Sequence, residues 1–177
     1  MIRITGGNLK GRTIKSVPDK RTRYTSSILR QAIFSIVNVE GRSFLDLFCG
    51  SCSVLIEALS RGATFGAGVD ISPKAIKTCR ENLKRLGLEG LSILYKADAT
   101  RFVRSKGEAF DVIFMDPPYE LGLVDRTLKN MREDILSEGG ILILEASKRE
   151  YFDIPKFLRI VRSREYGDSK LVVLKKV

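Results

Sequence analysis

Residues 43–62 read SFLDLFCGSCSVLIEALSRG, an apolar run that passes through a tight turn into a helical pattern. Residues 43–48 are predicted to form a strand that ends at Cys49-Gly50-Ser51. Residues 53–61 are predicted to form a helix, because their apolar side chains recur at helical spacing, and Gly62 ends it. A strand that leads directly into a helix is the repeating unit of an α/β protein with a parallel sheet.

The same alternation continues along the chain. Apolar runs that predict further strands lie at residues 65–71, 91–97, 110–115 and 141–144. Helical patterns lie between them, at residues 73–86, 100–105 and 122–136. Near the end, residues 158–165 and 170–175 flank a turn at Gly167-Asp168 and are predicted to pair as antiparallel strands. The chain is therefore predicted to be an α/β protein built on a mostly parallel sheet.

The N-terminal part of the chain has a different character. Residues 1–5 and 12–17 flank a turn at Gly6-Gly7-Asn8 and are predicted to pair as a hairpin. Residues 25–39 are predicted to form a helix. We interpret residues 1–40 as a hairpin-helix extension that contacts the substrate, attached to a main domain rather than forming a separate one.

The net charge of +10 is concentrated at the two ends of the chain. Residues 1–30 hold eight basic residues against one acidic residue, and residues 156–177 hold seven against two. Residues 31–155 are close to neutral, with 16 basic and 18 acidic residues. This distribution favours a main domain at 41–177 with basic ends that meet a polyanion, and nucleic acid is the favoured partner. The alternative is that the charge only keeps the protein soluble.

The composition excludes several classes of protein. A length of 177 residues predicts one domain. No run approaches the roughly 18 apolar residues that a membrane span needs, and the N-terminus has no apolar signal region, so we expect a cytoplasmic protein without membrane contact. The absence of histidine excludes Ser-His-Asp and Cys-His catalysis and any metal site that needs histidine, and we expect no metal. Three cysteines do not suggest a disulfide framework.

The predicted strand 110–115 ends at Asp116-Pro117-Pro118-Tyr119. In an open α/β sheet, ligands bind beyond the carboxyl ends of the strands. The two prolines lack backbone donors, so the carbonyls around them are free to accept hydrogen bonds from a ligand. A carboxylate, rigid prolines and an aromatic ring at this place predict a clamp for a flat substrate that carries an amine. The alternative is a turn that ends the strand, with Tyr119 only packing.

Three further acidic residues lie at or near the ends of the other predicted strands. Asp46 precedes the turn at Gly50, where the backbone can approach a ligand at a helix N-terminus. Asp70 lies twenty positions after Gly50, a spacing that suits a carboxylate that accepts ribose hydroxyls. Asp98 could accept an adenine amine. Each of these residues alone could be a helix cap, but together they favour a transferase that uses a nucleotide-like cofactor.

Several motifs give the chain a resemblance to a known family. They are Gly6-Gly7, Lys10-Gly11-Arg12, Arg23-Tyr24-Thr25, Arg30-Gln31-Ala32-Ile33-Phe34, Leu45-Asp46-Leu47-Phe48, Glu57-Ala58-Leu59-Ser60-Arg61-Gly62, Asp116-Pro117-Pro118-Tyr119 and Tyr166-Gly167-Asp168. The chain resembles class I S-adenosylmethionine-dependent methyltransferases and is most similar to the RsmD family, which methylates guanine N2 in small-subunit ribosomal RNA. It departs from that family at Cys52 and Leu55, where the family usually has glycine.

The resemblance implies a Rossmann-like class I methyltransferase fold, with a mostly parallel seven-stranded sheet and an antiparallel C-terminal strand. It implies S-adenosyl-L-methionine as cofactor, ribosomal RNA or an assembling small ribosomal subunit as partner, and we expect a monomer. The implied catalytic residues are Asp116, Pro117, Pro118 and Tyr119. The implied cofactor-binding residues are Asp46, Phe48, Gly50, Ser51, Cys52, Asp70, Ile71, Asp98, Ala99 and Asp116. The implied RNA-binding residues are Lys10, Arg12, Arg21, Arg23, Thr25 and Arg30.

Three alternatives remain open from the sequence. Cys49-Gly50-Ser51-Cys52, between a strand and a helix, has the spacing of a thioredoxin-like redox site. Cys52 and Leu55 are also compatible with an RNA-binding assembly protein that has lost its cofactor. Finally, the same clamp suits methylation of adenine N6, cytosine N4 or a protein glutamine.

Overall fold

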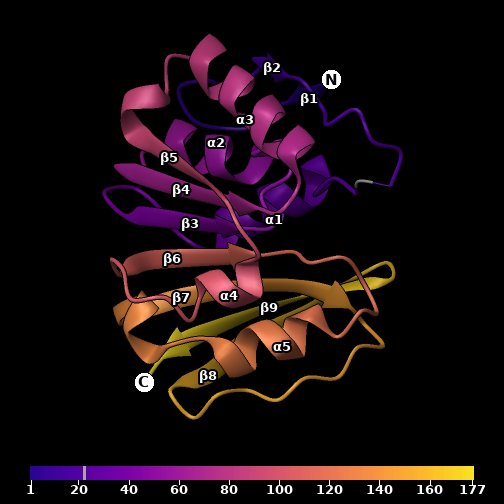
Figure 1. The fold of residues 1–177 in the computed structure, drawn as a ribbon, viewed down its shortest axis with the longest axis vertical. Helices are drawn as coiled ribbons and strands as arrows, with labels where there is room; N and C mark the ends of the chain where they lie inside the picture. Colours follow the sequence, from indigo (N-terminus) through magenta and orange to yellow (C-terminus); the bar gives the residue numbers. More distant parts are fainter. Residues whose placement is uncertain (22) are drawn as a thin grey trace.

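The computed structural model describes residues 1–21 and 23–177 and contains a seven-stranded sheet (Figure 1). Its strands are β3 (Ser43–Leu47), β4 (Phe65–Asp70), β5 (Ser92–Lys96), β6 (Phe110–Met115), β7 (Leu136–Ser147), β8 (Leu158–Tyr166) and β9 (Ser169–Lys176). They lie side by side in the order β5-β4-β3-β6-β7-β9-β8. Strands β3 to β7 run parallel to one another, and β9 runs antiparallel to both β7 and β8. The predicted mostly parallel α/β sheet with its antiparallel end is confirmed.

Helices alternate with the parallel strands along the chain, as is usual in an α/β fold. They are α1 (Ser27–Ile36), α2 (Ser53–Ser60), α3 (Pro73–Arg85), α4 (Ala99–Phe102) and α5 (Leu123–Asn130), with short 3-10 turns η1 (Glu89–Leu91) and η2 (Glu133–Ile135). Helix α3 begins as its sequence predicts, because the Ser72 hydroxyl accepts from the Ala75 amide and Pro73 follows the cap. Within the described part of the chain, no helix has the length and apolar character needed to span a bilayer.

The predicted helix 122–136 is wrong at its C-terminal end. Helix α5 ends at Asn130, and β7 begins at Leu136 instead of at Ile141. Strand β7 continues through Gly139-Gly140 as an irregularity of the β-bulge type. Its register against β6 shifts there, and Gly139 takes up the extra length in a left-handed conformation with φ of 67°. An irregularity of this kind looks like a turn in the sequence, since it uses the same residues.

Both faces of the sheet are buried, each by its own apolar cluster. Alternate residues of β6 point to opposite faces, so Phe114 joins one cluster and Ile113 and Met115 join the other. The first cluster also contains residues from α1, α2 and α3, and the second contains residues from α5. Because both faces are covered, the exposed carboxyl ends of the parallel strands are left as the natural place for a site.

The N-terminal extension packs on the end of α2. Its strands β1 (Ile2–Arg3) and β2 (Thr13–Ile14) form the predicted hairpin. In the turn between them, the Asn8 amide donates to the Ser60 carbonyl at 2.8 Å. Gly7 has a φ of 79°, and a side chain there would overlap the Ser60 carbonyl oxygen. Two of the family-like motifs, Gly6-Gly7 and Glu57-Ala58-Leu59-Ser60-Arg61-Gly62, are therefore in direct contact.

A buried ion pair joins the extension to the same helix. Glu57 of α2 is fully buried and accepts from Arg30 Nε at 2.9 Å and from Arg61 Nη2 at 3.1 Å, and it also accepts from Thr5. Arg30 donates further to the carbonyls of Arg3 and Thr25, both at 2.7 Å. This corrects the expectation that Arg30 holds RNA phosphates, because the residue is only 2% exposed and each of its three guanidinium nitrogens donates to a protein oxygen.

We expect Arg30→Ala to lower the free energy of unfolding by about 3–5 kcal/mol, because it leaves the buried Glu57 carboxylate short of its charged partner. Urea denaturation followed by circular dichroism measures this change. Arg21→Ala is the matched control, because Arg21 is 90% exposed and pairs with Asp19 at the surface, where a pair contributes about 0–1 kcal/mol. A loss below about 1 kcal/mol for Arg30→Ala would contradict the structural role of this pair.

Candidate active site

The predicted clamp lies at the carboxyl end of β6, in the middle of the sheet. Asp116 follows the last residue of the strand, Pro117 is buried, and the ring of Tyr119 is half-buried. The Thr25 hydroxyl donates to Asp116 Oδ2 at 3.1 Å. Thr25 was expected to contact RNA, but it is buried and its side chain faces the clamp. The segment before α1 thus reaches the clamp from a distant part of the sequence.

Glu145 is a residue of this site that the sequence analysis missed. It lies on β7, beside β6, and is only 3% exposed. The Tyr119 hydroxyl donates to Glu145 Oε1 at 3.0 Å, while Oε2 is buried without a hydrogen-bond partner among the described residues. The sequence could have indicated Glu145, because it is a single acidic residue within the apolar run Ile141–Ala146. Acidic side chains are rarely buried on a strand unless they have a partner or a function.

Arg23 covers the exposed side of the clamp. Its guanidinium carbon lies 3.8 Å from the centroid of the Tyr119 ring, a cation–π arrangement. Its Nη2 donates to the Tyr119 hydroxyl at 2.9 Å and lies 3.9 Å from Glu145 Oε1. The structure therefore brings Arg23, Thr25, Asp116, Tyr119 and Glu145 together at one strand end.

The charge state of Asp116 depends on its burial and on the neighbouring Glu145. Burial raises the pKa of Asp116 well above its usual value, and the neighbouring Glu145 raises it further. Burial, with Glu145 as the next cause, raises the pKa of Tyr119 to about 12. Tyr119 is consequently protonated at neutral pH and acts as a hydrogen-bond donor and a flat surface, not as a base.

The turn after β3 has the strained backbone of a binding loop. Phe48, Gly50 and Cys52 all adopt left-handed conformations, with φ between 54° and 64°. Asp46 at the end of β3 is buried, and neither of its carboxylate oxygens has a partner among the described residues. Burial raises its pKa well above the usual value, the Leu55 backbone amide opposes this shift, and the charge of Asp70 adds to it. An unpartnered buried carboxylate suits a ligand that brings a positive charge.

The ends of β4 and β5 lie next to this loop. Asp70 Oδ2 accepts from the Gly50 amide at 2.9 Å, which joins the end of β4 to the turn after β3. Ile71, the next residue, exposes 68% of its surface and offers an apolar contact to a ligand. Asp98 caps α4, since its Oδ1 accepts from the Thr100 amide and hydroxyl at 2.8 and 2.6 Å, and these hydrogen bonds lower its pKa. The remaining expected cofactor residues, Ser51 and Ala99, are buried beside these positions.

The cysteines depart from the prediction. Cys52 and Cys79 form a disulfide that joins the start of α2 to α3, although three cysteines had not suggested one. The bridge does not join Cys49 to Cys52, as a thioredoxin-like site would require. Burial raises the pKa of the Cys49 thiol well above its usual value, and Asp46 and Asp70 add to this, so the thiol is a poor nucleophile. The redox interpretation is therefore wrong.

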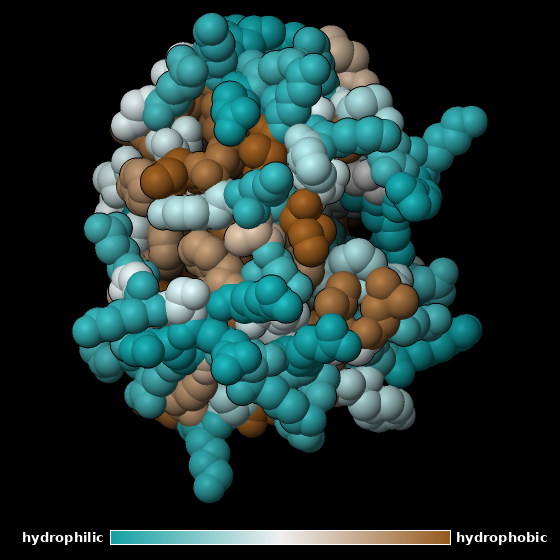
Figure 2. Space-filling view, in the orientation of Figure 1, coloured by the Kyte–Doolittle hydropathy of each residue, from teal (hydrophilic) through white to brown (hydrophobic). Residues whose placement is uncertain are grey.

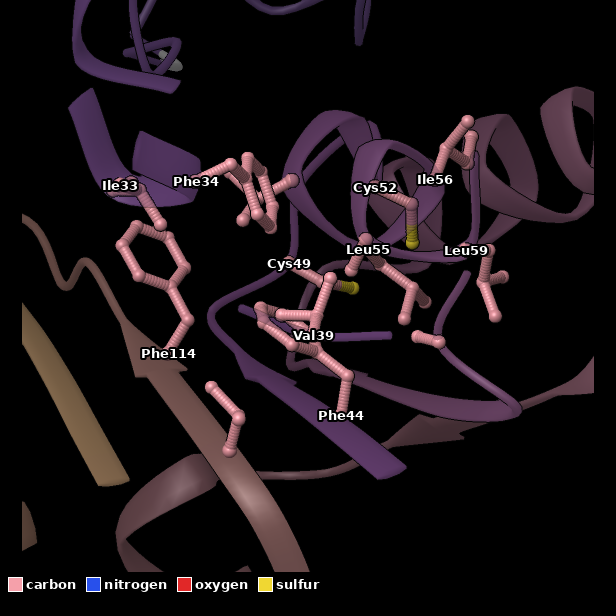
Figure 3. Close-up of a cluster of buried hydrophobic side chains, with 14 of the residues drawn as sticks. Ile33, Phe34, Val39, Phe44, Cys49, Cys52, Leu55, Ile56, Leu59 and Phe114 are labelled. Carbon is pink, nitrogen blue, oxygen red and sulfur yellow. The ribbon is translucent and has the colours of Figure 1, made fainter. Parts of the chain in front are cut away.

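The bulky side chains in the turn point into the protein. Figure 3 shows Cys49, Cys52 and Leu55 directed into the apolar cluster around Phe44. Cys52 and Leu55 are fully buried. Strand β4 makes room for them, because a Cβ at Gly66 would overlap Leu55 Cδ1 and a Cβ at Gly68 would lie 3.3 Å from Cys52 Sγ. The bulk at these two family glycine positions is thus placed away from the outer side of the turn.

The other predicted RNA-binding cations do not meet at the clamp. Lys10, Arg12 and Arg21 are exposed on the N-terminal extension. Lys10 lines a cleft of about 630 Å³ between the hairpin and the start of α1, together with Arg3. Figure 2 shows hydrophilic side chains over most of the face seen in Figure 1, with apolar residues gathered mainly over β5. Hydrophilic side chains, rather than one broad apolar surface, are what this face offers to a partner.

Comparison with known proteins gives concordant results. The family described as “Conserved hypothetical protein 95” matches residues 2–175. The “Ribosomal RNA small subunit methyltransferase D” of Buchnera aphidicola (subsp. Acyrthosiphon pisum) is 32% identical over 161 residues, which cover 88% of this chain and 83% of that protein.

Solved structures extend the similarity to the fold. The Escherichia coli protein named “Putative methyltransferase yhhF” superposes with a TM-score of 0.88 at 25% identity, over 99% of this chain and 97% of that one. An RNA methyltransferase from Salinibacter ruber, solved in complex with S-adenosyl-L-homocysteine, shares the fold with a TM-score of 0.68 at 19% identity, over 87% of this chain and 94% of that one.

The packing of Leu55 against Gly66 gives a stability prediction. We expect Gly66→Ala to destabilise the protein by about 1–3 kcal/mol, because the added methyl group overlaps Leu55. Leu55→Ala alone should cost about 2–5 kcal/mol through the cavity it leaves. The double variant should cost less than the sum of the two by about 0.5–3 kcal/mol, because each change relieves the other.

Urea denaturation of the four proteins measures this coupling. Gly107→Ala serves as control, since a Cβ there meets nothing within 4 Å, and its stability should change by less than about 1 kcal/mol. Additive effects of Gly66→Ala and Leu55→Ala would show that the two positions do not compensate each other.

Proposed function

The chain belongs to the family described as Conserved hypothetical protein 95, the RsmD family of methyltransferases, and we propose that it methylates the exocyclic N2 amine of a guanine in small-subunit ribosomal RNA. The observation that carries this proposal is the clamp at the end of β6, where the Asp116 carboxyl, the Pro117 carbonyl and the Tyr119 ring follow one another. The exposed cations of the N-terminal extension support an RNA substrate.

The strand ends beside the clamp fit S-adenosyl-L-methionine, whose sulfonium supplies the methyl group. Asp46 offers an unpartnered buried carboxylate to the cationic amino group of the cofactor. Asp70 keeps lone pairs for the ribose hydroxyls, and Ile71 offers an exposed apolar surface to the adenine. Asp98 and Ala99 follow β5 on the same side, where Asp98 Oδ2 is left to accept the adenine amine.

The clamp would make an exocyclic amine more nucleophilic. The lone pair of an exocyclic amine is delocalised into the base, so the nitrogen is a poor nucleophile. If Asp116 and the Pro117 carbonyl accept its two N–H groups, the lone pair turns toward the methyl group and the positive charge that develops on nitrogen is stabilised. Holding the two reacting atoms in line supplies a further part of the rate.

Tyr119 would hold the base by stacking, and this requires a movement. The guanidinium of Arg23 now lies on the face of the Tyr119 ring. A base that stacks on the same face displaces it, and Arg23 is then free to bind a phosphate. The base itself must be displayed in a loop or leave its helix to reach the clamp.

We expect Asp116→Asn to lower kcat by about 100- to 1000-fold, the scale measured for removal of one group that stabilises transition-state charge. Methylation of small-subunit ribosomal RNA and of partly assembled subunits with labelled cofactor measures the rate. Cofactor affinity by calorimetry should stay within a few-fold, which separates loss of chemistry from loss of the cofactor site. Asp134→Asn, an exposed aspartate on η2, is the matched control. Near-normal turnover of Asp116→Asn would overturn the proposed role.

The same residue predicts a pH dependence. The Asp116 carboxyl accepts most strongly when ionised, and burial together with Glu145 raises its pKa. The active, ionised form is therefore present above this raised pKa and is lost as the pH falls through it. We expect kcat to fall on the acid side at a higher pH than an ordinary aspartate would give. A rate that stays constant down to the usual aspartate range would contradict this expectation.

Salt should weaken RNA binding steeply if the extension holds phosphates. Each phosphate contact contributes about 0.7–0.9 to the slope of log K against log salt concentration. We expect the double variant Lys10→Ala and Arg12→Ala to reduce that slope by about 1.4–1.8 in filter-binding or anisotropy titrations. The control is Arg104→Ala with Lys106→Ala, two exposed cations in the loop that leads into the amino end of β6, opposite to the end that carries the clamp. An equal reduction in both double variants would argue against a role specific to the extension.

A further inference from the structure

We propose that Glu145 determines the specificity of the clamp for guanine, by accepting the N1–H group next to the amine that Asp116 holds. This inference rests on the proposed function, because it concerns the base that enters the same site. Glu145, from β7, would contact a second group of the base, whereas Asp116 and Pro117 contact only the amine.

The first argument is the state of the Glu145 side chain. A buried carboxylate is costly unless its oxygens are paired, and here both the Tyr119 hydroxyl and the Arg23 guanidinium approach Oε1, while no donor among the described residues reaches Oε2. A glutamine or an apolar residue would fill the same space on β7 without that cost. Among the described residues, the group beside this carboxyl is a second carboxyl, that of Asp116, and a flat ligand that brings two donors would satisfy both groups.

The second argument is where Glu145 lies relative to Asp116. In the β6–β7 pairing, Met115 lies opposite Leu144, so Asp116 and Glu145 are the next residues on the two adjacent strands. Glu145 is close enough to raise the Asp116 pKa. Tyr119 connects the two groups, since it follows Asp116 by three positions and donates to Glu145. A flat group that stacks on Tyr119 and contacts one carboxyl group therefore meets the other.

The third argument is the chemistry of the possible acceptor groups. Guanine presents its N2 amine beside N1–H, so its edge continues with a further donor. Adenine presents N6 beside the N1 acceptor, and cytosine presents N4 beside the N3 acceptor. A protein glutamine presents its amide nitrogen beside a carbonyl acceptor. A second carboxylate next to Asp116 suits guanine alone among these four, because it would face a lone pair in the other three.

Arg23 shows that a group of this kind fits the place. Its guanidinium is planar, carries N–H donors along its edge, and lies over the Tyr119 ring with Nη2 3.9 Å from Glu145 Oε1. The N1–H and N2 amine edge of guanine has the same planar arrangement of donors. Arg23 thus occupies the position that we assign to the base, and it exchanges with the base when RNA binds.

The test uses a base that keeps the amine and loses the N1–H group. The methylated guanine is first mapped in small-subunit RNA with the unmodified protein, and a short RNA is then made with either guanine or 2-aminopurine at that position. The unmodified protein should methylate guanine with a kcat/KM at least about 100-fold above that for 2-aminopurine, since sites built for a hydrogen bond reject analogues that lack it. Equal rates on the two RNAs would overturn the inference without any variant.

Glu145→Gln supplies the second arm, because its amide nitrogen can donate to the bare N1 of 2-aminopurine. We expect this variant to lose about 100-fold of kcat/KM on guanine and to reduce the preference for guanine below about 10-fold. A merely structural role of Glu145 would lower both rates and leave their ratio unchanged, and that result would overturn the proposal. Glu133→Gln, an exposed glutamate on η2, is the matched control and should leave the ratio as it is.

These experiments distinguish a failure of the proposed function from a failure of the role of Glu145. If the unmodified protein places the methyl group on a base other than guanine, or on protein, the proposed function is wrong and the role of Glu145 falls with it. If guanine N2 is methylated but 2-aminopurine serves equally well, or Glu145→Gln keeps the preference, the function stands and only the role of Glu145 is wrong.

Discussion

The buried charge of Glu57 is the constraint on which the arrangement of the site depends. Its partners come from the hairpin, from α1 and from Arg61, the residue directly after α2. Glu57 lies five residues after Cys52, where the turn that we assign to the cofactor ends. Its partner Arg30 lies five residues after Thr25, which contacts Asp116. One ion pair thus fixes the distance between the cofactor turn and the segment that approaches the substrate clamp. Such a pair contributes more to a unique arrangement than to net stability.

The acidic residues of the site are held in a state that favours ligand binding over stability. Asp46 and Asp116 lie at the carboxyl ends of central strands, where burial and a neighbouring carboxylate raise their pKa values and so disfavour their charged forms. A cationic cofactor group or a base with several N–H donors relieves this cost. Ligands that bind only the folded protein stabilise it by mass action. The energy spent on these unpartnered groups is therefore recovered when the site is filled, a common balance between stability and function.

Much of this fold follows from the sequence, because its strands and helices are short and strongly patterned. The parallel strands, the antiparallel end and the N-terminal hairpin were predicted from local periodicity and turns. What could not be predicted depends on contacts between distant residues. Arg30 shares the buried side of α1 with Ile33, but its partner Glu57 is 27 positions away. The Cys52–Cys79 pairing spans the same separation, and nothing local distinguishes a paired cysteine from a free one.

The turn at Cys52 shows why the residue types of a motif alone do not predict whether a ligand can approach the backbone. Glycine at such a place favours a left-handed backbone and lets a ligand come close. Cys52 adopts the left-handed conformation without being glycine, with a φ of 64°, and its side chain points inward to Cys79. The space that this requires is provided by Gly66 and Gly68 on the neighbouring strand. The glycines that make room for these side chains therefore lie on β4, and not in the turn itself. What a ligand meets depends on the direction of a side chain, and that direction is set by the packing of the strand behind the turn.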